Sequence, residues 1–140
     1  MFSVRLHKTD RGLGSLAVGA TRGPDGQGPS AVLAHGFAIS LDEWNVIAEA
    51  LVAGGHRVIA FDQRGHGRTT IGSDGVGSRQ TAGDYAAVLE GYDVSDGVLV
   101  MHSMGGFVGS RLLVPGAEHT VNWEAADVVV AEIGKLAGPA

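Results

Sequence analysis

Residues 98–107 read VLVMHSMGGF, and they join a short apolar run to a serine that is followed by Met104 and two glycines. An apolar run of this length that stops at a turn signal is typical of a buried strand. The glycines allow the backbone behind Ser103 to turn sharply and to approach neighbouring segments closely. We therefore predict a strand that ends in a tight turn, with Ser103 on the turn and a helix directly after it.

The segments on both sides of this turn alternate between strand and helix patterns. Two alternating segments separated by turn residues predict a hairpin, and short apolar runs predict buried strands. Apolar residues at helical spacing predict three helices. Strands that alternate with helices form a largely parallel sheet covered on both faces, so we expect an α/β three-layer sandwich in a single domain over residues 1–140. The expected strands are 2–7, 15–20, 30–35, 56–62 and 97–102, and the expected helices are about 40–53, 81–90 and 124–136.

The start of the first helix carries a cap signal. Ser40 and Glu43 have the spacing of a capping box, in which the glutamate side chain returns to the backbone N–H of the serine. Trp44 and Tyr85 fall on the apolar stripes of their helices, which predicts that both lie in the core and not in a binding site.

Composition and charge exclude several classes of function. The chain has no cysteine, and its six histidines show no pairing at ligand spacing, so we expect neither a metal nor another cofactor. The net charge of −5 and the scattered Lys and Arg residues argue against nucleic acid as a partner. No apolar run approaches the length of a membrane span, about 20 residues, and residues 1–20 lack the apolar core of a signal peptide. These features predict a cytoplasmic protein that binds neither membranes nor nucleic acid.

Three predicted strands end on residues that can carry chemistry, namely His35, Asp62 and Ser103. The carboxyl ends of parallel strands meet at one edge of a sheet, and ligands bind beyond that edge. Three polar and glycine-containing segments should therefore lie side by side there: HGF at 35–37, FDQRGHGRT at 61–69 and HSMGG at 102–106.

In their order and spacing, these three segments resemble the α/β-hydrolase superfamily, in the serine-nucleophile branch that holds esterases and perhydrolases. The resemblance runs from about Arg5 to Gly109, and PGAEHTVNWEAADVVVAEI, at 115–133, resembles the segment that closes the family fold. It implies that Ser103 is a nucleophile on a strained elbow and that His119 is its general base.

The resemblance also implies an oxyanion hole formed by the backbone N–H groups of Phe37 and Met104. The sequence departs from the family pattern at two points. Met101 occupies the first glycine of the family's G-x-S-x-G elbow, so its side chain should crowd the turn, and Met101→Gly should raise the rate. The only carboxylate between nucleophile and base is Glu118, so Glu118 and Glu124 are the candidate acids. The resemblance therefore implies a shortened fold that lacks the family's lid and acid-strand region.

The helix after the elbow decides whether Ser103 and His119 can meet. A helix over residues 104–113 would carry the chain about 15 Å away from the serine. The five or six residues that remain, at about 3.3 Å each, can only just return. A helix that ends near Gly109 would bring the two side chains together easily.

Each candidate residue also has a structural interpretation. A serine between a strand and a helix often serves as the helix N-cap, although the agreement of the three segments favours a nucleophile here. His35 and His66 are expected to hydrogen-bond within their loops, and Asp62 and Arg64 to form an internal ion pair. His102, which points away from the serine, is expected to be packed.

A nucleotide-binding motif is a weaker alternative. GLGSLA, at 12–17, fits the pattern G-x-G-x-x-A, but that motif needs a following helix of several turns. The residues after it alternate like a strand and soon reach further glycines, so nucleotide binding is disfavoured.

The residues and the resemblance together predict a weak esterase, which cleaves small, activated carboxylic esters through an acyl-enzyme. Two alternatives stay open: a non-catalytic remnant or interaction module, and a cofactor-free perhydrolase or haloperoxidase-like activity. The strand before Ser103 is expected near a sheet edge with an apolar flank, which predicts self-association as a homo-oligomer.

Overall fold

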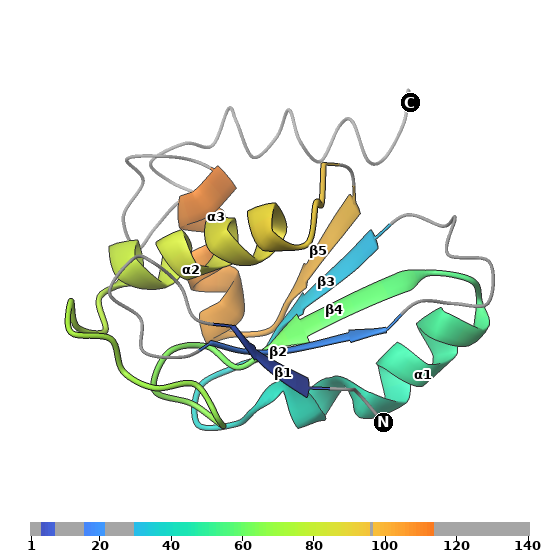
Figure 1. Ribbon diagram of the computed structural model, residues 1–140, viewed down its shortest axis with the longest axis horizontal. Coiled ribbons are helices and arrows are strands. Elements are labelled where there is room, and N and C mark those ends of the chain that lie inside the picture. The colour runs from blue at the N-terminus through green and yellow to red at the C-terminus, as the bar shows by residue number, and fades with distance from the viewer. Residues whose placement is uncertain (1–3, 8–15, 22–29, 96, 114–140) are drawn as a thin grey trace.

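The computed structural model of the protein describes residues 4–7, 16–21, 30–95 and 97–113 (Figure 1). Its elements follow the predicted alternation of strands and helices. The strands are β1 (Val4–His7), β2 (Leu16–Thr21), β3 (Ser30–Ala34), β4 (Arg57–Phe61) and β5 (Gly97–Met101). The helices are the 3-10 turn η1 (Leu41–Trp44) and the α-helices α1 (Asn45–Ala53), α2 (Ser78–Gly91) and α3 (Met104–Leu113).

The strands form one sheet in the order β1-β2-β4-β3-β5. β1 and β2 pair antiparallel, which confirms the predicted hairpin, and β2 also pairs antiparallel with β4. β3 lies between β4 and β5 and is parallel to both, with Ala34 opposite Phe61 on one side and Met101 on the other. This register brings the carboxyl ends of β3, β4 and β5 to one edge of the sheet, as the sequence predicted.

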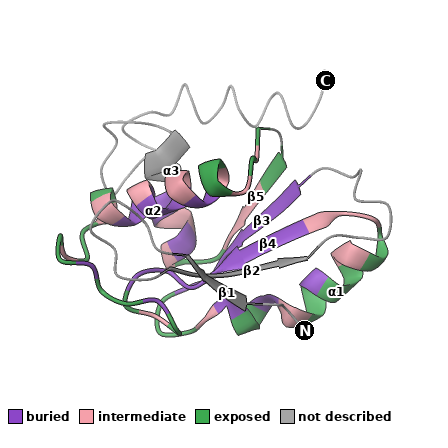
Figure 2. Ribbon diagram, viewed as in Figure 1, coloured by how far each residue is buried: buried purple, intermediate pink, exposed green. Residues whose placement is uncertain are grey.

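Helices cover both faces of the sheet, with η1 and α1 on one face and α2 and α3 on the other (Figure 1). Successive residues of a strand point to opposite faces, so β3 and β4 contribute to two cores. Val32 and Ile59 pack toward α2 and α3, whereas Leu33 and Ala60 pack toward α1. Figure 2 shows that β3 and β4 are more buried than β5. The predicted α/β three-layer fold is confirmed.

Two predicted helices differ in detail from the observed ones. The first opens with the 3-10 turn η1, where the Ser40 hydroxyl accepts from the Asp42 N–H at 3.3 Å. The Glu43 side chain does not return to Ser40 but accepts from the Gly36 N–H, so Ser40 caps the turn but the predicted capping box does not form. α2 begins three residues earlier than predicted. Trp44 and Tyr85 are buried in the core, as predicted.

β5 is the last strand in the sheet that the structure describes, and within that sheet its outer edge has no neighbour. Val98 on this strand is 58% exposed. A strand edge that has no neighbour and carries apolar side chains favours pairing with another segment, so self-association stays a prediction. The predicted closing helix at 124–136 lies outside the described residues.

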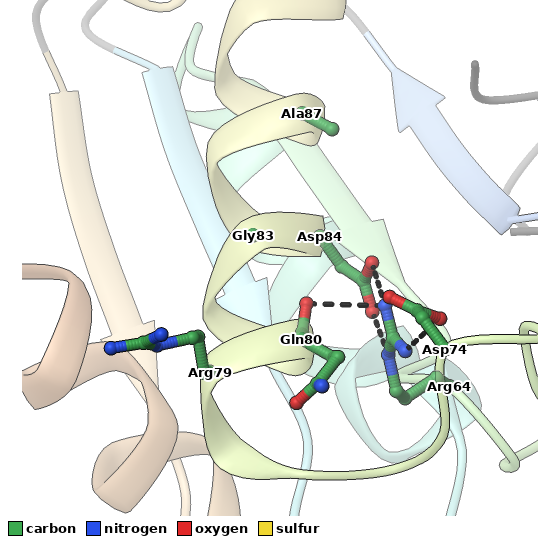
Figure 3. A pocket seen from close by; sticks show the side chains of 7 residues that line it. All are labelled: Arg64, Asp74, Arg79, Gln80, Gly83, Asp84 and Ala87. Carbon is green, nitrogen blue, oxygen red and sulfur yellow. Dashed lines mark hydrogen bonds and ion pairs between the residues drawn. The ribbon is translucent and has the colours of Figure 1, made fainter. Parts of the chain in front are cut away.

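A buried arginine holds the loop between β4 and α2 (Figure 3). The Arg64 guanidinium donates to both carboxylate oxygens of Asp84, at 2.6 and 2.7 Å, and to Asp74 at 2.9 Å. It also donates to the backbone carbonyls of Gly75 and Gln80. Arg64 and Asp84 are almost fully buried. Burial raises the pKa of the Asp84 carboxyl, and the hydrogen bonds from Arg64 offset part of that rise.

A pocket of about 280 Å³ opens beside this network. A guanidinium has five N–H donors, and the five hydrogen bonds of Arg64 use all of them. Arg79, which also lines the pocket, points away from Arg64 in Figure 3. The Arg64 network therefore anchors the loop to α2 and leaves none of its own N–H groups for a ligand.

We predict that Asp84→Asn lowers the free energy of unfolding by about 3–5 kcal/mol, because it leaves the buried charge of Arg64 without its main counter-charge. Asp74→Asn is the matched control. Its carboxylate binds the same guanidinium but is 39% exposed, so we expect a loss below about 1 kcal/mol. Urea unfolding of both variants measures the difference, and equal losses would contradict the prediction.

Candidate active site

The site forms where β3, β4 and β5 end. The backbone pairing of β3 with β5 continues one residue past β5, because the His102 N–H donates to the Ala34 carbonyl at 3.0 Å. The next residue, Ser103, leaves the sheet and leads into α3. The structure therefore places Ser103 at the carboxyl edge of the sheet, directly before a helix N-terminus.

The backbone of Ser103 has the strained conformation of a tight elbow. Its φ angle is 50°, in the left-handed region that costs a residue with a side chain about 1–3 kcal/mol. A helix N-cap has an extended backbone instead, and its side chain accepts from the first turn. Here the N–H groups of Gly105 and Gly106 donate to the backbone carbonyls of His102 and Ser103, at 2.8 and 2.9 Å. Ser103 is exposed. The N-cap interpretation of its hydroxyl is therefore wrong.

Gly105 allows the elbow to lie against β3. A Cβ at this position would stand 2.6 Å from the Ala34 carbonyl oxygen and 2.8 Å from that of His35, and both are backbone atoms that cannot move aside. A Cβ at Gly106 would meet only the Cβ of Met101, at an ordinary 3.9 Å. Of the two adjacent glycines, the close approach therefore depends on Gly105.

Met101 fits the elbow, contrary to the crowding expected from the sequence. Its side chain is half-buried beside the core that α2 and α3 form. Its sulfur lies in the space that a Cβ of Gly109 would occupy, one helical turn beyond Gly105. The missing side chain at Gly109 thus makes room for the thioether, so Met101→Gly is not expected to raise a rate by relieving the elbow.

Two backbone amides of the segments that follow β3 and β5 have no hydrogen-bond partner in the described part of the chain. One belongs to Met104, the first residue of α3, where N–H groups have no partner within the helix. The other belongs to Phe37, in the loop after β3, whose next residue, Ala38, has a φ of 61°. The Phe37 side chain is 71% exposed. An amide at a helix N-terminus carries partial positive charge, which suits a developing anion.

A buried polar chain connects the strand ends to the start of α3. His35 is fully buried, and its Nε2 accepts from the Gln63 backbone N–H at 3.0 Å. The ring proton is therefore on Nδ1, which donates to the Gly36 carbonyl at 2.6 Å. The Tyr85 hydroxyl donates to the Gln63 side chain at 2.8 Å and lies 3.4 Å from the Gly105 carbonyl. Burial raises the pKa of Tyr85, so this hydroxyl stays a donor.

Asp62, which follows β4, holds two neighbouring segments in place through backbone hydrogen bonds. Asp62 accepts from the N–H groups of Leu41 and Arg68, at 2.7 and 2.9 Å. The predicted ion pair of Asp62 with Arg64 is therefore wrong, because the two flanking loops already satisfy the buried carboxylate. Gly67 allows this contact, since a Cβ there would overlap the Asp62 side chain.

His66 has the structural role expected from the sequence. Its Nδ1 lies 3.1 Å from the Arg64 carbonyl, within the loop after β4. Its ring meets that of Phe37 edge to face, with centroids 5.6 Å apart. It also lies 5.3 Å from the ring of His35. His66 thus packs against the exposed Phe37 ring.

Sequence reasoning missed a contact between His102 and Glu43. The His102 Nδ1 lies 2.6 Å from a Glu43 carboxylate oxygen, and the His102 side chain is 54% exposed, so the prediction that it is packed is wrong. The other Glu43 oxygen accepts from the Gly36 N–H at 3.3 Å. The capping-box spacing predicted Ser40 as the partner of Glu43, whereas the observed partners are Gly36 and His102. The sequence holds one signal for this contact: His102 directly follows β5 as His35 follows β3, which places His102 beside the loop after β3.

The predicted general base and acids are not tested. His119, Glu118 and Glu124 lie outside the described residues. α3 does run over Met104–Leu113, which is the longer of the two helices considered from the sequence.

The described segments contain neither a metal-binding cluster nor a membrane-spanning helix. No three carboxylate or imidazole side chains there lie close enough together to hold a metal ion. Among the same residues, no helix combines the length and the hydrophobicity that crossing a bilayer requires.

The three parallel strands of the mixed sheet, the helices on both faces and the strained turn at Ser103 agree with an α/β-hydrolase fold. The chain belongs to this family, whose model, described as the alpha/beta hydrolase fold, matches residues 29–115. A solved structure of a probable hydrolytic enzyme from Pseudomonas aeruginosa has the same fold, with a TM-score of 0.71 and 28% identity. The match covers 79% of this chain and 36% of that one.

Curated relatives carry three kinds of name. A non-heme chloroperoxidase of Kitasatospora aureofaciens is 42% identical over 58% of this chain and 30% of its own length. Epoxide hydrolase B of Mycobacterium tuberculosis is 38% identical over 59% of this chain and 24% of its own length. A bifunctional esterase/perhydrolase of Acinetobacter calcoaceticus is 43% identical over 51% of this chain and 26% of its own length. The chain spans less than a third of the length of each of these proteins.

We predict that Gly105→Ala destabilises the protein by about 1–3 kcal/mol, because the new methyl group collides with two backbone carbonyls. Gly106→Ala is the matched control at the next position. It meets no such obstacle, and the alanine should stabilise the helix by up to about 1 kcal/mol. Thermal unfolding of the two variants should show shifts of opposite sign, and equal shifts would refute the assigned close approach.

We also predict that His35 makes stability depend on pH. Burial lowers the pKa of His35 below its ordinary 6.5, although its hydrogen bond to Gly36 opposes that shift. As the pH falls through 6.5, the unfolded chain binds this proton and the folded protein does not. The free energy of unfolding therefore decreases by up to about 1.4 kcal/mol per pH unit below that point and is unaffected above it.

Urea unfolding at pH 7.5 and 5.5 measures this dependence. His35→Gln keeps an acceptor and a donor but does not titrate, so its stability should fall less between the two pH values. Parallel decreases in the parent and the variant would show that other groups cause the effect.

Proposed function

We propose that this chain carries the nucleophile of a serine hydrolase, which cleaves small carboxylic esters through an acyl-enzyme formed on Ser103. The observation that supports it most is the backbone of Ser103, which is held at a φ of 50° between β5 and α3 with its side chain exposed. A protein retains such strain where the surrounding structure imposes it, and strained residues cluster at active sites. Ester hydrolysis also agrees with one of the curated relatives, which is named an esterase/perhydrolase.

In the proposed reaction, the Ser103 hydroxyl oxygen attacks the ester carbonyl carbon. The carbonyl oxygen takes the negative charge, and the N–H groups of Met104 and Phe37 are the proposed donors to it. Each such donor typically contributes about 3 kcal/mol to transition-state stabilisation. The alcohol then leaves, and water releases the acid from the acylated serine.

His119 is the proposed general base, which takes the proton from the Ser103 hydroxyl and returns it to the leaving alcohol, and Glu118 or Glu124 is the proposed acid of the triad. α3 rises about 15 Å over its ten residues. Six residues follow from Leu113 to His119, and in extended form they span about 20 Å. The chain is therefore long enough for His119 to return to the serine.

A second reaction is proposed because two of the relatives are named a chloroperoxidase and an esterase/perhydrolase. Hydrogen peroxide in place of water would attack the same acyl-enzyme. That step releases a peracid and returns the proton to the serine, so it needs no cofactor. The ratio of peracid to acid, measured from one ester at increasing peroxide concentration, separates the two reactions.

We predict that Ser103→Ala and His119→Ala lower kcat/KM for p-nitrophenyl acetate by about a thousandfold or to the buffer rate, since each removes a group that acts in the chemical step. Ser95→Ala is the control, because Ser95 is exposed at the opposite end of β5 and should keep the parent rate. A fluorophosphonate should add its mass to the parent and to Ser95→Ala but not to Ser103→Ala. Equal rates in all four proteins would instead support a non-catalytic role.

A further inference from the structure

The Glu43 carboxylate joins two segments that are 66 positions apart in sequence. One oxygen accepts from the Gly36 N–H at 3.3 Å, in the loop after β3. The other lies 2.6 Å from the His102 Nδ1, directly after β5. Glu43 itself sits on the 3-10 turn η1, and its side chain is only 24% exposed. A single carboxylate therefore bridges the ends of two strands.

A second observation shows how tightly these segments are held together. A Cβ on Gly36 would stand 2.9 Å from the His102 Nδ1 and 3.1 Å from its Cε1. The imidazole thus lies directly against the backbone of the loop after β3, in space that only a glycine leaves free. The approach is somewhat less close than that at Gly105, where a Cβ would stand 2.6 Å from the Ala34 carbonyl oxygen.

The residues that Glu43 contacts are adjacent to the ones that carry the proposed chemistry. Gly36 precedes Phe37, and His102 precedes Ser103 and Met104. The two proposed oxyanion donors are on different segments, so their separation is fixed only by contacts between those segments. A bridge one residue away from the first donor and two from the second constrains that separation.

We propose that Glu43 is a positioning residue, which fixes the Phe37 and Met104 amides relative to each other by bridging Gly36 and His102. The inference deepens the proposed function and rests on it for its catalytic consequence. Charge alone does not suffice for this role, because the carboxylate must reach both partners at once. A side chain one methylene shorter loses at least one of the two contacts.

The test uses four variants of the full chain: Glu43→Ala, Glu43→Asp, Glu43→Gln and, as control, Asp42→Ala. Asp42 lies on the same turn, and its carboxylate makes only an exposed ion pair with Arg68 at 3.7 Å and a contact to Ser40. Amide NMR spectra report the Phe37 and Met104 resonances directly. Hydrolysis of p-nitrophenyl acetate gives kcat and KM separately.

We expect Glu43→Ala and Glu43→Asp to shift both amide resonances and to lower kcat about tenfold to hundredfold with little change in KM, because a misplacement of about 1 Å costs that much. Glu43→Gln keeps an oxygen for the Gly36 N–H and an amide for the imidazole, so it should retain most of the parent rate. Asp42→Ala should leave both readouts unchanged. Glu43→Asp keeps the negative charge, and it provides the comparison if Glu43→Ala fails to fold.

The two readouts separate the inference from the proposed function. If the parent shows no hydrolysis that depends on Ser103 but Glu43→Asp shifts both amides, the serine hydrolase proposal fails and the positioning role of Glu43 is supported. If both amides keep the parent positions in Glu43→Asp, the inference is overturned, whatever the rates are. It is also overturned if the amides shift in an active protein while kcat stays the same.

Discussion

Parallel pairing of β3 with both β4 and β5 is the constraint on which the rest of the structure depends. Residue Ala34 lies opposite Phe61 and Met101, so three strands reach the same edge at the same level. Every polar segment singled out from the sequence begins at that edge. The buried groups that follow the strands can then satisfy one another, which isolated loops could not do.

At this edge, glycines allow close backbone approach, and buried polar side chains form hydrogen bonds between the segments. Gly105 lets the start of α3 touch the carbonyls that end β3, and Gly36 lets the His102 ring touch the following loop. Between these contacts, His35, Gln63 and Tyr85 form a hydrogen-bonded chain in the interior. Because these groups are buried and paired, removing any one of them leaves a partner unsatisfied. The strained backbone at Ser103 is held by surroundings that have little freedom to relax.

The two carboxylates that bind the loops around this edge act in different ways. Asp62 accepts only backbone N–H groups and thereby joins the start of η1 to the loop after β4. Glu43 accepts one backbone N–H group and also contacts an imidazole that is half exposed. The first contact is fully enclosed and serves folding, whereas the second lies beside the exposed serine. Glu43 thus connects the segments that carry Phe37 and Ser103, whereas Asp62 connects two other loops.

The amino-acid sequence by itself determined the α/β class, the common edge at which three strands end and the tight turn at Ser103. These follow from apolar runs, helical spacing and glycines, which act locally or through chain direction. It did not determine the partners of the charged side chains. Asp62 binds backbone instead of Arg64, Arg64 binds Asp84 from α2, and Glu43 reaches His102 across 59 positions. Only the tertiary structure decided these contacts. A charged side chain binds the partner that the packing of distant elements brings within about 3 Å, and that distance cannot be read from spacing along the chain.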